Sequence, residues 1–357
     1  MLLRRAGDVL RKLSVGVLGA TGTIGQMFLS MLGSHPNFKV KCIAASKRSA
    51  GKRLRNLRVL YPICDEFLEM PIQDVETAKF DELDLVFSGL PSDVAGPVES
   101  RIAQTGTWVF SNAASHRMDR HAPILLPEVN ASHIRVVERQ ATRGKIVTNS
   151  NCTTVGLVIA LAPIKDLCER VHMVSYQALS GGGYPGVPSL DGLGNVMPYI
   201  EKEEPKVVQE TRKMLGRERN GIIDDWDVEV TAQCARVPVR DGHLEAVSID
   251  LTERTGAKEV KERMSSFRGE MKGMRLPTAP ERPIIVMEEP DRPQPVLDVN
   301  AGEPERARGM SAVVGRVNVQ GRKLMFYVLS HNVVRGGAGE SILNAEYALA
   351  KGYLKKV

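Results

Sequence analysis

Gly19-Ala20-Thr21-Gly22-Thr23-Ile24-Gly25 is the stretch that decides the fold of this chain. Residues 12–18 before it form a short apolar run that predicts a buried strand, and residues 26–32 after it predict a helix. A strand, a glycine turn and a helix open a dinucleotide-binding fold, because the glycines let the backbone approach a pyrophosphate at the helix N-terminus. The spacing is GxxGxxG rather than GxGxxG, so a simple tight turn is the alternative.

The second predicted strand, residues 39–45, ends where such a fold holds the adenosine ribose. Enzymes that use NAD usually have Asp or Glu at this point, whereas this chain has Ser46-Lys47-Arg48-Ser49. Hydroxyl groups and cations suit a 2′-phosphate, which predicts NADP as the cofactor. A solvated basic turn is the alternative.

Two more buried strands are expected at residues 83–88 and 107–111, and each ends in small polar residues. Ligands of open parallel sheets bind at such carboxyl ends. Arg117 follows the second of these strands and adds a cation near the same edge. Residues 127–130 are expected to form a turn before the next strand, at residues 145–148.

Ser150-Asn151-Cys152-Thr153-Thr154 follows that strand and precedes a predicted buried helix at residues 156–161. Cys152 is therefore expected at a helix N-terminus, where unpaired N–H groups and the helix dipole favour a thiolate. It is the only one of the five cysteines with hydroxyl or amide neighbours on both sides. A small buried thiol is the alternative, but the polar setting favours a catalytic nucleophile.

Beyond the cysteine, partial alternation of apolar and polar residues predicts a mainly antiparallel sheet with one covered face. The five segments are residues 171–179, 228–237, 243–251, 310–317 and 323–329. Helices at residues 205–215 and 257–267 are expected to cover this sheet. The proline-rich residues 277–302 are expected to form an extended connection or a subunit contact. An apolar stripe at Ile342, Ala345, Leu349 and Tyr353 predicts a last helix that packs on the first domain.

Composition narrows the classes of protein that fit. A chain of 357 residues is long enough for two domains with separate cores. The net charge of +6 comes without a dense basic run, which favours phosphorylated small molecules over nucleic acid. Five scattered cysteines with no CxxC pair favour a reducing compartment, without a disulfide framework or a zinc site.

No apolar run approaches the length of a membrane span. The basic residues 1–5 lack the apolar core of a signal peptide. A cytoplasmic location is therefore expected, with an organellar presequence as the alternative.

A nucleophilic cysteine needs a base, and His243 stands at the start of a predicted strand. Arg236 lies seven residues before it and is expected to flank the same pocket and bind an anion. The glycine-rich residues 180–188 follow Gln177 and allow the backbone to approach a ligand closely. These residues alone indicate an NADP-linked acyl-transfer or aldehyde chemistry with a cysteine nucleophile.

The ordered set of motifs resembles the aspartate-β-semialdehyde dehydrogenase family, especially its archaeal and fungal branch. The resemblance covers nearly the whole chain. It rests on GATGTIG at 19–25, SKRSAGK at 46–52, LPSDVAGPV at 90–98, SNAASHR at 111–117, SNCTT at 150–154, YQALSGGGYPG at 176–186, EEPK at 203–206, RVPVRDGH at 236–243 and HNVVRGGAG at 331–339.

The resemblance implies a role for each matching position. Among the catalytic residues, Cys152 would be the nucleophile, His243 the acid/base, Gln177 the residue that orients the substrate, and Asn151 part of the oxyanion site. Among the substrate-binding residues, Arg236 would bind the α-carboxylate, Glu203 the amino group, and Arg117 and Lys206 the phosphate. The NADP site would be lined by Gly19, Thr21, Gly22, Thr23, Ile24, Ser46, Arg48, Ser49, Ser88 and Asn332.

The resemblance also implies an α/β fold in two parts. A Rossmann-like NADP-binding domain would comprise residues 1–150 and a C-terminal helix at residues 333–357. Residues 151–332 would form an α+β catalytic and dimerisation domain with a mainly antiparallel mixed sheet. The protein would be a homodimer or a homotetramer.

The implied reaction is reversible and serves lysine, threonine and methionine biosynthesis. L-aspartyl-4-phosphate and NADPH would give L-aspartate-4-semialdehyde, phosphate and NADP through a cysteine thioester. A malonyl-CoA or succinyl-CoA reductase on the same scaffold is an alternative, although that branch departs from Ser-Asn before the cysteine. N-acetyl-glutamyl-phosphate reductase is also similar, but its Tyr-Pro motif adjoins the cysteine, whereas Tyr184-Pro185 here lies far downstream. A non-catalytic NADP-binding sensor is the alternative from another class.

Overall fold

The computed structural model describes residues 11–355, so the basic residues 1–5 lie outside it. Its first sheet has six strands in the order β3-β2-β1-β4-β5-β6. Every neighbouring pair is parallel, which brings all the carboxyl ends to one edge. The strands are β1 (Leu13–Leu18), β2 (Phe38–Ala45), β3 (Ile72–Asp74), β4 (Leu85–Ser88), β5 (Trp108–Ser111) and β6 (Ile146–Thr148).

Helices flank this sheet and connect its strands. They are α1 (Thr23–Leu32), α2 (Asp65–Glu69), α3 (Ser92–Thr105) and α4 (Pro127–Asn130), with 3-10 turns η1 (Leu54–Asn56) and η2 (Ala131–Arg139). The prediction of a turn at residues 127–130 is wrong, because these residues form the short helix α4. Pro127 supplies a φ that suits a first helical position. The buried Asn130 side chain accepts the Leu126 N–H at 2.8 Å and closes the turn.

The second sheet also has six strands, in the order β10-β7-β11-β14-β13-β12. Three of its pairs are antiparallel and two are parallel, which confirms the predicted mainly antiparallel mixed sheet. Its strands are β7 (Cys168–Gln177), β10 (Glu229–Arg236), β11 (His243–Leu251), β12 (Ile284–Val286), β13 (Ala312–Gln320) and β14 (Lys323–Ser330). A separate small hairpin pairs β8 (Arg217–Arg219) with β9 (Ile222–Asp224).

One face of the second sheet is covered by helices α5 (Thr154–Leu161), α7 (Glu203–Met214) and α8 (Ala257–Ser266). Every residue of α5 is buried, so this helix runs through the core of the second half of the chain. The remaining elements are η3 (Ala162–Leu167), η4 (Leu179–Gly182), α6 (Ser189–Gly192), α9 (Pro295–Asp298) and η5 (Glu305–Ala307). The proline-rich residues 277–302 contain the short strand β12 and the short helix α9, and their other residues form turns and irregular connections.

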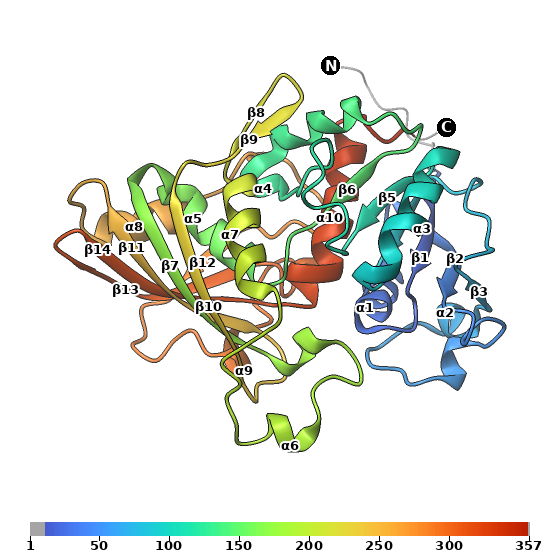
Figure 1. Cartoon of the computed structure of the whole chain (residues 1–357), viewed down its shortest axis with the longest axis horizontal. Helices are drawn as coiled ribbons and strands as arrows, with labels where there is room; N and C mark the ends of the chain where they lie inside the picture. The colour runs from blue at the N-terminus through green and yellow to red at the C-terminus, as the bar shows by residue number, and fades with distance from the viewer. Residues whose placement is uncertain (1–10, 356–357) are drawn as a thin grey trace.

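The last elements of the chain return to the first sheet, as the apolar stripe predicts. The turn η6 (Val334–Ala338) leads into α10 (Gly339–Ala350), whose Ile342 and Ala345 are fully buried in the core beneath β1 and β4. Figure 1 shows α10 at the boundary between the two sheets. The predicted α/β class, a parallel dinucleotide-binding sheet joined to an α+β sheet, is confirmed.

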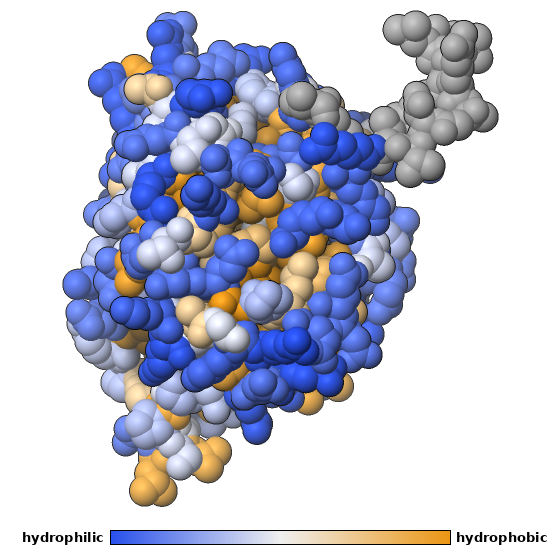
Figure 2. Space-filling view, turned by 90° about the vertical axis from the view of Figure 1, so that its right-hand side faces the viewer, coloured by the Kyte–Doolittle hydropathy of each residue, from blue (hydrophilic) through white to orange (hydrophobic). Residues whose placement is uncertain are grey.

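The surface on the side of the first sheet is mostly hydrophilic, as Figure 2 shows. Hydrophobic side chains gather at its lower tip, at the height where Figure 1 places α6. Leu190 and Leu193, in and just after α6, are 92% and 69% exposed. No helix within residues 11–355 is long and apolar enough to cross a membrane.

Candidate active site

The ends of three neighbouring strands place Arg236, Gln177 and His243 side by side on the covered face of the second sheet. Arg236 on β10 pairs with Gln177 on β7, and Leu244 on β11 pairs with Tyr176 on β7, which puts His243 next to Gln177. Directly paired residues point to the same face of a sheet, so the three side chains form one row. All three are buried. The structure therefore brings Arg236 and His243 together beside Cys152, and of these two residues Arg236 lines the cavity whereas His243 contacts the sulfur from behind it.

Cys152 faces this row from the turn between β6 and α5. Its Sγ lies 3.3 Å from Nε2 of His243, and it lines a cavity of about 340 Å³ together with Arg236 and Gln177. Gly336, in the turn before α10, packs directly against Cys152. A Cβ on Gly336 would lie 2.5 Å from the Cα of Cys152, so only glycine allows this contact.

The protonation of this pair differs from the prediction. Burial, with the Glu203 carboxylate as the next contribution, raises the pKa of the Cys152 thiol to about 12. Burial and the charge of Arg236 lower the pKa of His243 to about 3. The prediction that the helix start favours a thiolate is therefore wrong, because desolvation of a charged sulfur outweighs the helix dipole here. Near neutral pH the pair is a thiol beside a neutral imidazole.

Glu203, at the start of α7, is held by three residues around the pocket. Its carboxylate accepts hydrogen bonds from Asn151 Nδ2 at 3.1 Å, Thr153 Oγ1 at 2.9 Å and Gln177 Nε2 at 3.0 Å. The other end of the same Gln177 amide accepts Nη1 of Arg236 at 3.4 Å. Gln177 thus links an anion to a cation inside one cavity.

Arg117 is held rigidly at another wall of the cavity. Its guanidinium donates to Asn149 O at 2.9 Å, to Asn112 O at 2.8 Å and to Glu210 Oε1 at 3.0 Å. The second oxygen of Glu210 accepts the Asn151 N–H at 2.6 Å. Sequence reasoning missed Glu210, and the acidic face of a helix gave no signal that could have singled it out.

Glu245 is a buried carboxyl next to the row formed by Arg236, Gln177 and His243. Glu245 is two residues after His243 on β11 and is paired with Ser175 on β7, so it points to the same covered face. Burial, and then the charge of Glu203, raises the pKa of Glu245 well above its ordinary value. A neutral Glu245 adds no second negative charge beneath the Glu203 carboxylate.

The remaining predicted residues divide between two cavities. The cavity around Cys152 is lined by Asn151, Gln177, Arg236, Arg117, Glu203, Lys206, Thr23, Ile24 and Asn332. A second cavity, of about 660 Å³, is lined by Gly19, Thr21, Gly22, Ser46, Arg48 and Ser49. Ser88 is fully buried and lines neither cavity.

The second cavity has the charge that a dinucleotide phosphate requires. Lys47, Lys52 and Arg58 also line it, beside the predicted Arg48. Glu76, which follows β3, lines it as well and was not expected from the sequence. Four cations against one carboxylate give a net positive cavity at the carboxyl end of β2, which fits the adenosine half of NADP with its 2′-phosphate.

Asn332 ties the two sides of the catalytic cavity together. Its Oδ1 accepts the Gly242 N–H at 2.8 Å, and its Nδ2 donates to Ser180 Oγ at 2.8 Å. It therefore fixes the residue before His243 and the start of the glycine-rich loop after β7.

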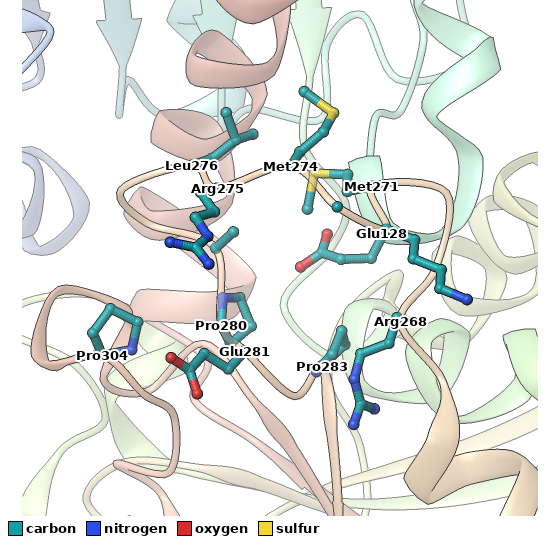
Figure 3. Close-up of a pocket in the computed structure, with 13 residues that line it drawn as sticks. Glu128, Arg268, Met271, Met274, Arg275, Leu276, Pro280, Glu281, Pro283 and Pro304 are labelled. Carbon is teal, nitrogen blue, oxygen red and sulfur yellow. The ribbon is translucent and has the colours of Figure 1, made fainter.

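A further cavity, of about 510 Å³, lies apart from these two (Figure 3). Met271, Met274 and Leu276 form much of its wall, and the carboxyl of Glu128 points toward its centre. Glu128 is paired with the buried Arg335 at 2.7 Å. None of the residues that the sequence singles out for catalysis or binding lines this cavity.

Two family models match this chain. Residues 14–137 match the model described as "Semialdehyde dehydrogenase, NAD binding domain", and residues 161–335 match "Semialdehyde dehydrogenase, dimerisation domain". These matches, together with the contact between Cys152 and His243, define the chain as a semialdehyde dehydrogenase in the broad sense.

Comparison with individual proteins narrows the class. The aspartate-semialdehyde dehydrogenase of Archaeoglobus fulgidus is 47% identical over 343 residues, which cover 93% of this chain and 97% of that protein. The crystal structure of aspartate semialdehyde dehydrogenase with NADP from Candida albicans has a TM-score of 0.86 and 35% identity, and the match covers 96% of this chain and 99% of that chain. The malonyl CoA reductase (NADP) of Metallosphaera sedula is 37% identical, over 97% of this chain and 99% of that protein.

The chain belongs to the aspartate-semialdehyde dehydrogenase family. It is an NADP-dependent oxidoreductase.

Proposed function

We propose that this chain interconverts L-aspartyl-4-phosphate and L-aspartate-4-semialdehyde, with NADPH and NADP as the redox partners, in lysine, threonine and methionine biosynthesis. The observation that carries the proposal is the arrangement of Glu203, Gln177 and Arg236. Opposite charges stand at the two ends of one amide in the cavity that holds Cys152.

This arrangement matches the two charged groups of an α-amino acid. Arg236 can bind the α-carboxylate through two parallel hydrogen bonds, and the Glu203 carboxylate can accept the α-ammonium group. Asn151, Thr153 and Gln177 hold Glu203 in place before a substrate arrives. The reacting carbon of such a substrate would then lie toward Cys152.

The chemistry that we propose begins at Cys152. Its thiol adds to the aldehyde carbon, and one proton must move from sulfur to the carbonyl oxygen. Nε2 of His243, 3.3 Å from the sulfur, is placed to give its proton to that oxygen while the ring takes up the proton of the thiol. NADP supplies the hydride acceptor for the oxidation that leaves a thioester on Cys152. Phosphate then cleaves the thioester, which restores the thiol and yields the acyl phosphate.

Arg117 and Lys206 are the residues that we propose for the phosphate group. Both line the cavity around Cys152. Arg117 is nearly buried and held by Asn149, Asn112 and Glu210, so its charge is fixed in position. Lys206 lies one turn after Glu203 on α7 and is partly exposed, which suits a flexible cation that meets an incoming anion.

A malonyl-CoA reductase is the second candidate, because the Metallosphaera sedula protein is also similar. The malonyl group has no ammonium group, so the Glu203 carboxylate would have no partner in the reacting part of such a substrate. Ser150 and Asn151 before the cysteine also keep the dehydrogenase form. Both observations favour aspartate semialdehyde.

The experiment compares two reactions of the purified protein. NADP reduction is measured with aspartate semialdehyde and phosphate, and NADPH oxidation is measured with malonyl-CoA. We expect the first reaction to proceed and the second to be at background. Cys152→Ser should remove turnover and leave NADPH binding and folding intact, because a serine hydroxyl is a far weaker nucleophile. Turnover of malonyl-CoA alone would reject the proposal.

We also propose the division into domains. Residues 1–150 with the C-terminal helix at 333–357 would bind NADP, and residues 151–332 would carry catalysis and dimerisation. The apolar residues Leu190, Leu193, Val296 and Leu297 are all more than half exposed within this second part. Such exposure supports a homodimer or homotetramer, which light scattering of the purified protein would test. We propose a cytoplasmic location.

A further inference from the structure

Tyr184 belongs to the second half of the chain but lines the cavity at the carboxyl end of β2. All other residues that line this cavity lie between Gly19 and Val94. The side chain of Tyr184 is 57% exposed, which is unusual for a large aromatic residue. Because this exposed ring lines a cavity of the other domain, a ligand bound in that cavity would cover it.

Val94 on α3 lines the same cavity as Tyr184, together with Leu90 and Pro91, and is 37% exposed. Two exposed apolar side chains from different domains therefore meet one cavity that is also lined by four cations, three hydroxyl groups and one carboxylate. A flat aromatic ligand that carries phosphate groups would satisfy both kinds of wall.

The loop that carries Tyr184 has open space around Gly183 and is held in place at Ser180 and Gly181. Gly183 has a φ of +73°, and a Cβ there would have no atom within 4 Å. At the fixed end, Ser180 accepts the hydrogen bond from Asn332. Gly181 lies so close to Arg236 that a Cβ would be 2.6 Å from its Nη1. The loop thus joins the substrate pocket to the second cavity.

We propose that Tyr184 stacks on the adenine ring of NADP and completes the adenosine half of the cofactor site from the catalytic domain. The proposal rests on the use of NADP described above. The adenosine half is assigned because Arg48 and Ser49 line the same cavity as Tyr184, whereas Cys152 lines the other one. The apolar face of the ring, rather than its hydroxyl, makes the contact.

The test measures binding instead of turnover. Dissociation constants of NADPH, from its fluorescence, and of adenosine 2′,5′-bisphosphate, from calorimetry, are compared for wild type, Tyr184→Ala and Tyr184→Phe. Stacking on a base predicts that Tyr184→Ala weakens both ligands about fivefold to tenfold. Tyr184→Phe should stay within about twofold of wild type, since the aromatic face remains.

Tyr199→Ala is the matched control. Tyr199 is 69% exposed in the same excursion of the chain and lines neither cavity. The Tyr199→Ala variant should bind both ligands as wild type does. Melting curves should show that all variants are folded. Wild-type affinity in Tyr184→Ala, an equal loss in Tyr199→Ala, or a loss confined to NADPH would each overturn the proposal. Failure of the wild-type protein to bind NADPH would instead reject the proposed function.

Discussion

The backbone N–H of Ala178 donates a hydrogen bond of 3.1 Å to Nδ1 of His243. A nitrogen that accepts this bond carries no proton, so the neutral ring holds its proton on Nε2. Nε2 is the atom that faces Sγ of Cys152. The end of β7 therefore presents His243 to the sulfur as a hydrogen-bond donor.

This tautomer predicts an order among substitutions of His243. The side-chain amide of Gln can place an N–H near the position of Nε2, whereas Ala cannot. We expect His243→Gln to retain about tenfold more kcat than His243→Ala, with both variants well below wild type. Steady-state kinetics with aspartate semialdehyde and phosphate would show the difference. Equal activities of the two variants would mean that donation from Nε2 is of no use without proton transfer.

The reactivity of Cys152 should depend steeply on pH. Because the pKa of its thiol is raised to about 12, the thiolate fraction grows about tenfold per pH unit throughout pH 7–9.5. The rate of alkylation by iodoacetamide should rise accordingly, without a plateau. Mass spectrometry of the Cys152 peptide separates its reaction from that of the exposed Cys64. A plateau between pH 6 and 8 would show a thiolate and contradict the expectation.

Arg236→Lys should separate aspartate semialdehyde from simple aldehydes. A lysine cannot form two parallel hydrogen bonds to a carboxylate, and two such bonds in a buried site are worth roughly 3–5 kcal/mol. We expect kcat/KM for aspartate semialdehyde to fall about 10²- to 10⁴-fold. The same constant for an analogue without the carboxylate should hardly change.

The alternative for Arg236 is a purely structural arginine, since its Nη1 also donates to Ala178 O at 2.9 Å. In that case Arg236→Lys would lower the melting temperature and reduce both rate constants equally. A loss of less than about tenfold with aspartate semialdehyde would likewise remove Arg236 from the substrate site.

Arg48→Ala should change the choice of cofactor. A charge-assisted contact to the 2′-phosphate is worth roughly 1.5–3 kcal/mol, so NADP should lose about tenfold or more in affinity while NAD is nearly unaffected. Lys79→Ala, which removes an exposed cation outside the cavity, is the matched control. If both cofactors weaken equally, Arg48 does not contact the 2′-phosphate.

Glu210 should matter for stability as well as for the position of Arg117. Glu210→Ala leaves the guanidinium buried without its anion, which typically costs about 3–5 kcal/mol. The free energy of unfolding in urea measures this cost. Gln209→Ala, an exposed substitution on the same helix, should change it by less than about 0.5 kcal/mol. A loss below about 1 kcal/mol for Glu210→Ala would mean that Arg117 finds another partner.

The sequence predicts those features that depend on short stretches of chain. The glycine turn at residues 19–25, the strand before it and the place of Cys152 after β6 all follow from local pattern. The short strands β3, β8, β9 and β12 were missed, because three residues carry too little periodicity to be distinguished from a loop.

The electrostatics of the site could not be predicted in the same way. The thiolate expected at Cys152 followed from its local helix start, whereas the pKa depends on burial and on Glu203, which α7 brings from 51 residues away. Ala178 acts through its backbone N–H, which every residue type except proline shares. The effects of Glu203 and of the Ala178 N–H therefore cannot be predicted from the residues next to Cys152.

The contact between Gly336 and Cys152 has a consequence for the newly made protein. Gly336 is synthesised about 180 residues after the cysteine, which at typical rates of translation is roughly 10–40 seconds later. During that interval the turn that carries the thiol lacks the wall provided by η6 and α10. Oxidants and electrophiles can therefore approach Cys152 in the nascent chain from a side that Gly336 covers in the finished fold, where the cavity is the remaining way in.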